Sequence, residues 1–309
     1  MDTETRKVII IGSGPAGLTA ALYAARANLK PLVIGGLIYG GQLMITTDVE
    51  NFPGFPSGIQ GPELMQKMIE QAKRFGAEII FEDATKVDFG QKPFKVTVGD
   101  KTYQGESIIA ATGASSIWLG LPSEEKFRGK GISSCATCDG FFFKEKDIIV
   151  VGGGDAAMEE ALYLTKFAKK VTVLNRSDKL RASQIMQDRA KTNSKITIEF
   201  NKTVEEFLGG DHLTGVKVKD IKTGQIEERP IEGVFIAIGH KPNTEIFAGQ
   251  IDLDAKGYIV PKDQTKTSID GVFVAGDVRD YRYRQAVTAA GMGCMAAMDV
   301  EKYLHMDQG

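Results

Sequence analysis

A strand-turn-helix pattern that occurs twice, 140 residues apart, constrains this chain more than any other feature of its sequence. Residues 8–17 read Val-Ile-Ile-Ile-Gly-Ser-Gly-Pro-Ala-Gly, and residues 148–157 read Ile-Ile-Val-Val-Gly-Gly-Gly-Asp-Ala-Ala. In each copy an apolar run of strand length leads into a glycine-rich turn, and a segment with helical periodicity follows, residues 18–27 or 158–168. A second short strand comes next. Two such openings of βαβ units predict an α/β protein with two doubly wound, three-layer nucleotide-binding domains.

The glycine spacing in both copies is typical of dinucleotide binding. The first glycine forms the tight turn, the second lets the backbone approach a pyrophosphate, and the third position must be small so that helix and strand can pack. The N-terminus of the helix then faces the anion. The predicted phosphate-binding residues are Gly12, Ser13, Gly14, Pro15, Ala16 and Gly17 in the first copy, and Gly152, Gly154, Asp155 and Ala156, with Ala157 in the third place, in the second.

Two dinucleotide sites in one chain predict one bound flavin and one exchangeable nicotinamide. The residue after the second strand separates the sites, because NAD sites carry an acid there and NADP sites carry cations. The second copy has Asn175 at this place, with Arg176, Lys179 and Arg181 close by, which favours NADP. The first copy has Gly35 and Gly36, with neither an acid nor cations.

The end of the chain completes the first domain. A strand that ends in Gly276-Asp277 belongs with the first copy if the second domain is inserted into the first. Residues 108–114 and 234–239 each read as a strand that leads to a glycine. We expect each to be the last strand before the chain passes into the other domain. We therefore predict a discontinuous flavin-binding domain, residues 1–117 and 247–309, and a nicotinamide-binding domain, residues 118–246.

A Cys-x-x-C pair, Cys135 and Cys138, lies within the second predicted domain. The chain has only three cysteines, which excludes a disulfide scaffold, and its three histidines are scattered, so we predict no metal site. Two incidental buried thiols are one interpretation, and the other is a dithiol/disulfide couple. Because the chain also has two dinucleotide sites, we predict a couple that receives electrons from a nicotinamide through the flavin. Asp139, the only ionisable side chain other than the cysteines within residues 135–143, is the candidate general acid/base, or else a turn residue before Gly140.

Charge and hydropathy exclude other classes of protein. The net charge of −2 provides no basic surface for nucleic acid. The apolar runs are far shorter than the roughly 18 residues of a membrane helix, and the N-terminus lacks the order of a signal peptide. We therefore expect a cytoplasmic protein that binds neither nucleic acid nor membrane.

The motifs together resemble those of the low-molecular-weight thioredoxin reductases. They are Gly12 to Gly17, Gly40-Gly41-Gln42-Leu43, Val49-Glu50-Asn51-Phe52-Pro53-Gly54, Cys135-Ala136-Thr137-Cys138-Asp139-Gly140, Ala275-Gly276-Asp277-Val278 and Arg284-Gln285-Ala286. The resemblance implies a homodimer, a thioredoxin substrate with its own Cys-x-x-C, Cys138 facing the flavin, Cys135 attacking thioredoxin, and a rotation between the domains. It implies FAD bound by the first glycine turn and by Gly35, Gly36, Gly41, Gln42, Asn51, Val87, Ala111, Gly113, Asp277, Arg284, Gln285 and Ala286.

One motif departs from the pattern of that family. The family's NADPH motif reads His-Arg-Arg-x-x-x-Arg, whereas this chain has Asn175-Arg176-Ser177 and then Arg181, so one cation is missing. NADPH is the expected donor, with NADH or a protein donor as the alternative, and another dithiol protein could replace thioredoxin. A flavin-binding redox sensor is the rival from another class. Trp118 and residues 141–143 are expected either in a docking surface for the partner or in the core.

Overall fold

The computed structural model describes residues 5–46 and 48–306. The chain divides into two compact units, Met1–Ser115 with His240–Gly309, and Ser116–Gly239. The second unit is thus inserted into the first. The chain passes between the units after Ser115 and after Gly239, whereas the sequence analysis places these boundaries near residues 117 and 247. Among the described residues no helix is long and apolar enough to cross a membrane.

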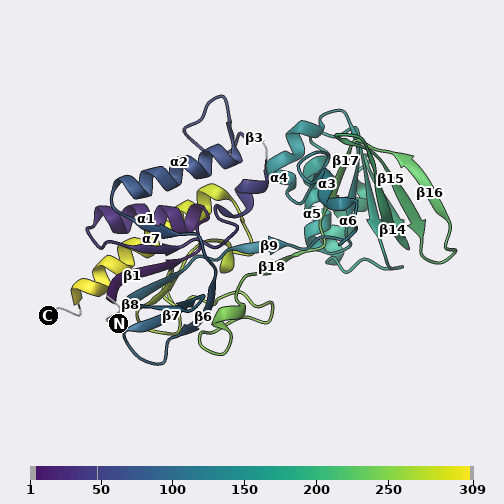
Figure 1. Cartoon of the computed structure of the whole chain (residues 1–309). Coiled ribbons are helices and arrows are strands. Elements are labelled where there is room, and N and C mark those ends of the chain that lie inside the picture. Colours follow the sequence, from purple (N-terminus) through teal and green to yellow (C-terminus); the bar gives the residue numbers. More distant parts are fainter. Residues whose placement is uncertain (1–4, 47, 307–309) are drawn as a thin grey trace. The chain divides into compact units, whose positions relative to one another are not determined.

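The first unit contains the N-terminal half of the repeat and the C-terminal helix (Figure 1). Its helices are α1 (Pro15–Arg26), α2 (Gly61–Arg74) and α7 (Ala286–Met306), with 3-10 helices η1 (Gly41–Ile45), η3 (Glu245–Phe247) and η4 (Gly276–Val278). Its strands are β1 (Thr5–Ile11), β2 (Leu32–Ile34), β3 (Asp48–Val49), β4 (Ile59–Gln60), β5 (Glu78–Ile80), β6 (Ala84–Asp88), β7 (Phe94–Val98), β8 (Lys101–Ala110) and β19 (Val272–Val274). The crossing strands β9 (Ala114–Ser116) and β18 (His240–Pro242) pair with each other.

The main sheet of the first unit has the order β5-β2-β1-β8-β7-β6, with β19 paired to the end of β8. The pairs from β5 to β8 and the β8–β19 pair are parallel, while β6 and β7 are antiparallel additions. Residues 8–11 are buried because both faces of this central strand are covered, as is usual in a parallel sheet. Helices α1 and α7 lie side by side over one face (Figure 1), and their small residues allow this, since a Cβ on Gly293 would lie 2.1 Å from the carbonyl oxygen of Ala16.

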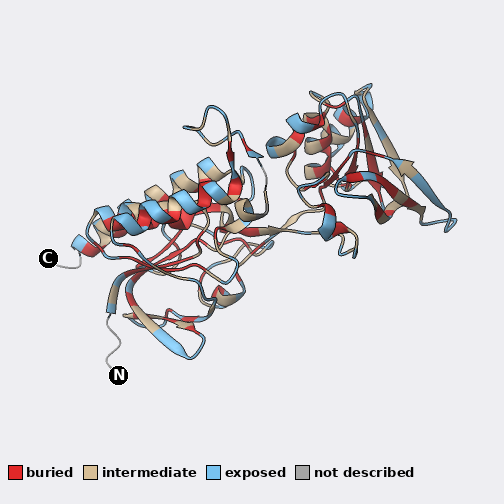
Figure 2. Cartoon of the chain, turned by 45° about the horizontal axis from the view of Figure 1, so that its top comes forward, coloured by how far each residue is buried: buried red, intermediate tan, exposed pale blue. Residues whose placement is uncertain are grey.

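The second unit contains the other half of the repeat (Figure 1). Its helices are α3 (Glu124–Phe127), α4 (Ala136–Asp139), α5 (Asp155–Leu164) and α6 (Gln184–Thr192), with the 3-10 helix η2 (Gly140–Phe143). Its strands are β10 (Ile132–Ser133), β11 (Asp147–Val151), β12 (Lys170–Asn175), β13 (Ile196–Phe200), β14 (Lys202–Gly209), β15 (Leu213–Asp220), β16 (Ile226–Pro230) and β17 (Gly233–Ile236). The parallel sheet has the order β10-β17-β11-β12-β13, and β14, β15 and β16 form an antiparallel meander. Figure 2 shows the buried residues concentrated on the strands and on the inner sides of the helices of both units.

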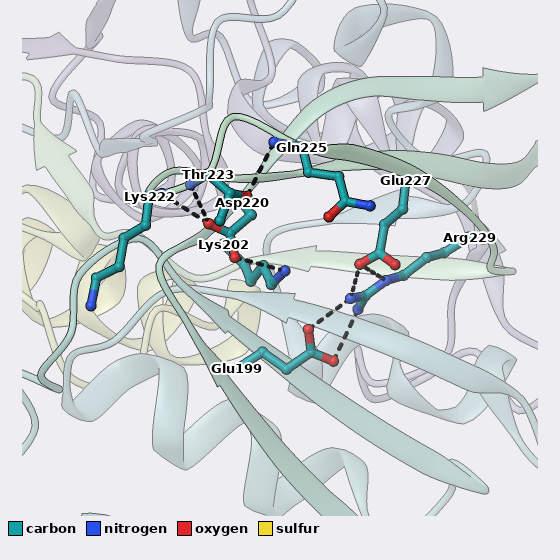
Figure 3. A network of polar contacts seen from close by, with 8 residues as sticks. All are labelled: Glu199, Lys202, Asp220, Lys222, Thr223, Gln225, Glu227 and Arg229. Atoms are coloured by element: carbon teal, nitrogen blue, oxygen red, sulfur yellow. Dashed lines mark hydrogen bonds and ion pairs between the residues drawn. The ribbon is translucent and has the colours of Figure 1, made fainter.

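A network of charged side chains joins the meander to the parallel sheet (Figure 3). Arg229 of β16 donates two hydrogen bonds, 3.0 and 2.8 Å, to the two carboxylate oxygens of Glu199 on β13. At the turn after β15, the Asp220 carboxylate accepts a 2.9 Å hydrogen bond from the Thr223 amide and pairs with Lys202 at 3.1 Å, and these contacts lower the pKa of Asp220 to about 2. A bidentate arginine contact fixes geometry more strictly than a single ion pair. The Arg229–Glu199 contact therefore ties β16 of the meander to β13 of the parallel sheet.

The two halves of the repeat form equivalent turns. The amide of Gly12 donates to the Ile34 carbonyl at 2.9 Å, and the amide of Gly152 donates to the Leu174 carbonyl at 3.1 Å. The helices begin at Pro15 and Asp155, three residues earlier than the periodicity predicts, because Gly14 and Gly154 themselves occupy the N-cap positions. Each glycine turn thus leads directly into the N-terminus of its helix.

Candidate active site

The first glycine turn leaves no room for side chains at two of its three glycines. A Cβ on Gly12, whose φ is +116°, would lie 2.2 Å from the carbonyl oxygen of Ala111, and a Cβ on Gly17 would lie 1.9 Å from the carbonyl oxygen of Gly12. Gly14 differs, because a Cβ there would meet no described atom within 4 Å. The turn is therefore closed against the protein at Gly12 and Gly17 and open at Gly14, as a backbone that approaches a ligand requires.

Ser13 holds the loop after β2 against this turn. Its buried hydroxyl donates to the Gly35 carbonyl at 2.6 Å and accepts from the Gly40 amide at 2.9 Å. A Cβ on Gly41 would lie 3.4 Å from the Cα of Gly14, so the two segments are in contact. Gly36 and Gly41 have φ of +81° and +66°, which glycine adopts without strain. Ser13 therefore positions Gly35, Gly36 and Gly41 around the open side of the turn.

A buried carboxylate lies on the same side of the first unit. Gly276 of η4 touches the first turn of α1, since a Cβ on it would lie 2.8 Å from the Cβ of Ala16. Next to it, Oδ1 of Asp277 is buried and has no hydrogen-bond partner among the described residues. Burial and the neighbouring Asp280 raise the pKa of Asp277 to about 7, while Arg284 opposes the shift. Because buried polar atoms are normally hydrogen-bonded, an acceptor left open here fits a bound group that carries hydroxyls.

Arg284 and Gln285 connect this segment to other parts of the first unit. Arg284 has φ of +49° and donates from a guanidinium nitrogen to Nε2 of His240 at 3.0 Å. Burial and this guanidinium lower the pKa of His240 to about 4, so the imidazole is neutral at pH 7. The Gln285 side-chain oxygen accepts from the Asn51 amide at 3.3 Å, and Ala286 begins α7. The structure thus brings Asn51 next to Arg284 and Gln285, although Asn51 and Gln285 are 234 residues apart in the sequence.

The remaining predicted flavin residues have different environments. Val87 has its side chain in the core, and its carbonyl accepts from the Gln250 amide at 2.6 Å. Ala111 is buried beside Gly12, with its amide donating to the Ile11 carbonyl at 2.8 Å. Gly113, with φ of +71°, faces open space, and Gln42 is exposed on η1. Val87 and Ala111 could therefore meet a ligand through little more than backbone.

The second glycine turn repeats this geometry in the second unit. A Cβ on Gly152 would lie 2.4 Å from the Ala237 carbonyl oxygen, and Gly154 is open, with no described atom within 4 Å of its Cβ position. The Asp155 carboxylate oxygen Oδ1 accepts from both the amide and the hydroxyl of Ser183, each at 2.8 Å. Ala156 is partly exposed at the start of α5. A dinucleotide phosphate thus fits at Gly154, while Asp155 holds the start of α6.

Asn175 and its neighbouring cations take different positions at the end of β12. The Asn175 side chain is buried, and its amide donates to the carbonyls of Ser177 at 2.9 Å and Lys179 at 3.0 Å. The side chains of Arg176, Lys179 and Arg181 are exposed and make neither an ion pair nor a hydrogen bond with any described residue. The cations are therefore available to an anionic ligand, and the asparagine amide is engaged by the protein.

The Cys135–Cys138 pair forms a disulfide in the second unit, with Cα atoms 5.3 Å apart. Cys135 is the N-cap residue of α4, and its carbonyl accepts from the amides of Cys138 and Asp139 at 3.2 and 3.1 Å. The short helical turn fixes both sulfurs within bonding distance. Cys135 is half-buried and Cys138 is exposed on this unit.

Asp139 lies in a small hydrogen-bonded group with the disulfide segment. The hydroxyl of Ser133, at the end of β10, donates to Oδ2 of Asp139 at 2.5 Å and accepts from the Cys135 amide at 3.0 Å. Burial raises the pKa of Asp139, and the Ser133 hydrogen bond opposes that shift. Ser133 was not predicted from the sequence, because nothing in a buried serine at a strand end distinguishes it from an ordinary core residue. The arrangement places a carboxyl group that can hold a proton beside the redox pair.

Comparisons with known proteins agree with this arrangement. Residues 6–293 match the protein family described as pyridine nucleotide-disulphide oxidoreductase. The chain is 56% identical to a thioredoxin reductase of Rickettsia conorii over 306 residues, 97% of this chain and 99% of that protein. It is 54% identical to one from Mycolicibacterium smegmatis over 298 residues, 96% of each. The chain belongs to the pyridine nucleotide-disulphide oxidoreductases.

A solved structure gives the same assignment. The thioredoxin reductase from Streptococcus pyogenes MGAS5005 superposes with a TM-score of 0.94 at 44% identity, covering 99% of this chain and 100% of that one. Within the pyridine nucleotide-disulphide oxidoreductases, the chain groups with the low-molecular-weight thioredoxin reductases, as its motifs predict. It is therefore a flavoprotein oxidoreductase that uses a pyridine nucleotide, and the predicted α/β fold with two nucleotide-binding domains is confirmed.

The environment of Asp277 predicts that the free energy of unfolding of the flavin-free oxidoreductase depends on pH. A carboxyl group whose pKa rises to about 7 on folding contributes stability that is lost as the pH increases from about 4 to about 7. Asp277→Asn should remove this loss and stabilise the flavin-free chain at pH 8 by at most about 4 kcal/mol. Urea unfolding of the wild type and the variant at pH 5 and pH 8 measures the difference. Equal stability differences at the two pH values would contradict the assignment.

The Ser133–Asp139 contact predicts a shift in the pH profile of this flavoprotein. Ser133→Ala removes the hydrogen bond that stabilises the carboxylate, so the pKa of Asp139 should increase further, and the fall in activity on the alkaline side should move to higher pH. The causes of the shift in the pKa of Asp139 are its burial, which raises the pKa, and the Ser133 hydrogen bond, which lowers it. The measurement is kcat for disulfide reduction between pH 6 and pH 10. Ser133→Thr keeps the hydroxyl and should retain the wild-type profile.

Proposed function

We propose that this protein is an NADPH-dependent thioredoxin-disulfide reductase with FAD as its bound flavin. The observation that supports this most directly is the Cys135–Cys138 disulfide with Asp139 held beside it through Ser133, in the unit that also contains the second glycine turn. The thioredoxin reductases of Rickettsia conorii and Mycolicibacterium smegmatis, which are similar to this chain over nearly their whole length, support thioredoxin as the substrate.

FAD fits the first unit and NADPH fits the second. The open Gly14 position, the Ser13-positioned loop and the unpartnered Asp277 oxygen would hold FAD, and the open Gly154 position with Arg176, Lys179 and Arg181 would hold NADPH. A flavin held there would supply the two-electron transfer that links the nicotinamide to the disulfide. Because the disulfide and the second glycine turn belong to one unit while one flavin must serve both, the cycle requires the two units to change their arrangement.

The chain's own residues then perform thiol-disulfide exchange. The Cys135 thiolate attacks one sulfur of the substrate disulfide, which forms a mixed disulfide and releases the other substrate sulfur as a thiolate. Cys138 attacks Cys135 of the mixed disulfide, which restores the Cys135–Cys138 bond and releases the second substrate thiolate. Asp139 holds the proton that is exchanged as the active-site thiols form and ionise. Two electrons leave the dithiol, and the substrate disulfide gains them.

Two aromatic side chains near the disulfide suit a protein substrate. Phe141 and Phe142 are 57% and 38% exposed at η2, directly after α4, whereas Phe143 is buried against Phe235. Trp118 is partly buried, with the Arg128 guanidinium 4.2 Å from its ring centre. Of the aromatic residues singled out in the sequence, Phe141 and Phe142 are thus the ones that can contact a docked thioredoxin.

We also propose a homodimer that acts in the cytoplasm, the compartment where dithiols are kept reduced. The outer side of α7 carries four exposed apolar side chains, those of Val287, Met295, Met298 and Met306. A stripe of this kind on a soluble protein is typical of an interface. Sedimentation of the wild type at two concentrations, with Met298→Glu for comparison, tests the association; a wild-type protein that sediments as a monomer at both would overturn it.

The proposed reaction is tested by an anaerobic titration of the flavin absorbance. NADPH should bleach the flavin at lower concentration than NADH, and oxidised thioredoxin added afterwards should restore the absorbance. If dithionite bleaches the flavin and neither nucleotide does, NADPH is not the electron donor and that part of the proposal is wrong. If NADPH bleaches the flavin but thioredoxin does not restore the absorbance, thioredoxin is not the substrate.

A further inference from the structure

The loop between β12 and α6 carries three cations and one acid, Asp178, and none of the three cations forms an ion pair with a described residue. Arg176, Lys179 and Arg181 are exposed and have no side-chain partner among the described residues, although the whole chain has a net charge of −2. The loop begins where a nicotinamide dinucleotide places its adenosine ribose in this fold class. Whether it binds a 2′-phosphate depends on where its backbone holds these side chains.

The side chain of Asn175 determines the course of that backbone. Its amide nitrogen has two hydrogens, and it donates one to the Ser177 carbonyl and the other to the Lys179 carbonyl, at 2.9 and 3.0 Å. The loop therefore turns around the amide group. A carboxylate in the same place could not do this, because it has no hydrogen to donate. Asn175 itself is only 4% exposed, whereas Ser177 and Lys179, whose carbonyls accept these hydrogen bonds, lie at the surface, so both bonds are half-buried.

The same loop is fastened to the second glycine turn. The side-chain oxygen of Asn175 lies so close to Gly153 that a Cβ there would be 2.1 Å from it. The Gly153 carbonyl accepts from the amides of Arg181 and Ala182 at 2.7 and 3.0 Å, and Asp155 accepts from Ser183. Asn175, Gly153 and Asp155 thus fix the loop to the turn at three places.

We propose that Asn175 determines the selectivity of this site for a 2′-phosphorylated dinucleotide, as a positioning residue that acts through Arg176, Lys179 and Arg181. This inference rests on the proposed use of NADPH. The Asn175 amide holds the backbone of the loop through its bonds to the Ser177 and Lys179 carbonyls, and it adds no negative charge. Because the amide is engaged in this way, the ligand contacts are left to the cations. An asparagine here therefore serves as a spacer that arranges the phosphate-binding side chains, although one family cation is replaced by Ser177.

The test measures the two dissociation constants separately. Asn175→Ala in the complete flavoprotein should weaken NADP+ binding by about ten-fold or more, because a loop that the amide no longer holds would misplace at least one of the three cations and so lose one charge-assisted contact. It should change NAD+ binding by less than about two-fold. Calorimetric titration gives both values without turnover. Equal weakening for both nucleotides would reduce Asn175 to a structural role and overturn the proposal, as would an unchanged NADP+ affinity.

Three further variants make the result specific. Asn193→Ala removes an asparagine at the other end of α6 that accepts from the Lys195 amide at 3.0 Å, and it should leave the ratio of the two constants unchanged. Ser177→Arg should strengthen NADP+ binding by about ten-fold in the wild-type background and much less in the Asn175→Ala background, because the added cation needs the closed loop. If Asn175→Ala does not fold, Asn175→Ser keeps one donor and should show a smaller loss of selectivity.

Hydrogen exchange provides a readout that does not depend on a ligand. Amides of residues 176–183 should exchange faster in Asn175→Ala than in the wild type, with no change in β11 or α5. A wild-type protein that binds NAD+ and NADP+ equally would overturn the proposed donor together with this inference. A wild type that prefers NADP+, with a variant that keeps the full preference, would overturn the inference alone.

Discussion

Replacing Cys135 and Cys138 by serine should reduce the rate of thioredoxin reduction by about a thousand-fold or more, while NADPH still bleaches the flavin at the wild-type rate. The serine hydroxyl cannot form the mixed disulfide, and the second unit contains no cysteine other than this pair. The loop that this disulfide closes spans a sequence separation of three, so its loss changes the entropy of the unfolded chain less than the loss of a long loop would. We therefore expect the variant to fold. Stopped-flow absorbance separates the two half-reactions.

Single variants and the third cysteine supply the controls. Cys294 is a free cysteine on α7 in the first unit, with its sulfur 3.9 Å from that of Met298, and Cys294→Ser should reduce thioredoxin at the wild-type rate. Cys135→Ser and Cys138→Ser should each be as inactive as the double variant, because both sulfurs are needed to complete one exchange. A double variant that still turns over thioredoxin would show that the electrons leave the flavin by another route.

Adding one methyl group at Gly17 should destabilise the protein by about 3 kcal/mol or more and prevent flavin retention. The Cβ of an alanine at this position would lie 1.9 Å from the carbonyl oxygen of Gly12, and the backbone of a tight turn cannot move away without breaking the contact of Gly12 with Ala111. Gly17 does not have a positive φ, so the effect arises from the lack of space. Urea unfolding and the flavin content of the purified protein measure both results.

Gly14→Ala is the matched variant, because the same methyl group meets no described atom within 4 Å at that position. The flavin-free protein should unfold at the wild-type urea concentration, while the flavin content should fall, since the methyl group fills the space into which a pyrophosphate would fit. Equal destabilisation by the two variants would contradict the distinction between the closed and open sides of the turn. An unchanged flavin content in Gly14→Ala would place the pyrophosphate elsewhere.

The sequence by itself determined those features that depend on residues close together in the chain. The repeat at 8–17 and 148–157, the strand-turn-helix order and the Cys135–Cys138 pair could all be predicted, because hydrophobic period, glycine spacing and a short Cys-x-x-C loop are local properties. Family motifs extended the prediction to the flavoprotein class, which the relatives confirm. The individual cofactor contacts and the domain boundaries remain predictions.

Only the tertiary structure decided what each side chain does. Ser133 reaches Asp139 because β10 and α4 meet, Asn51 reaches Gln285 across 234 residues, and Ser13 reaches Gly40 through a loop that returns to its turn. Asn175 has the residue type of a ligand contact in the sequence, but its amide is buried and bonded to its own loop. Hydrogen-bond partners and burial are set by long-range packing, and the pKa of a carboxyl group such as Asp277 follows from that packing. The sequence therefore identifies the chemistry that the chain carries, and the packing of distant segments assigns each residue its part in it.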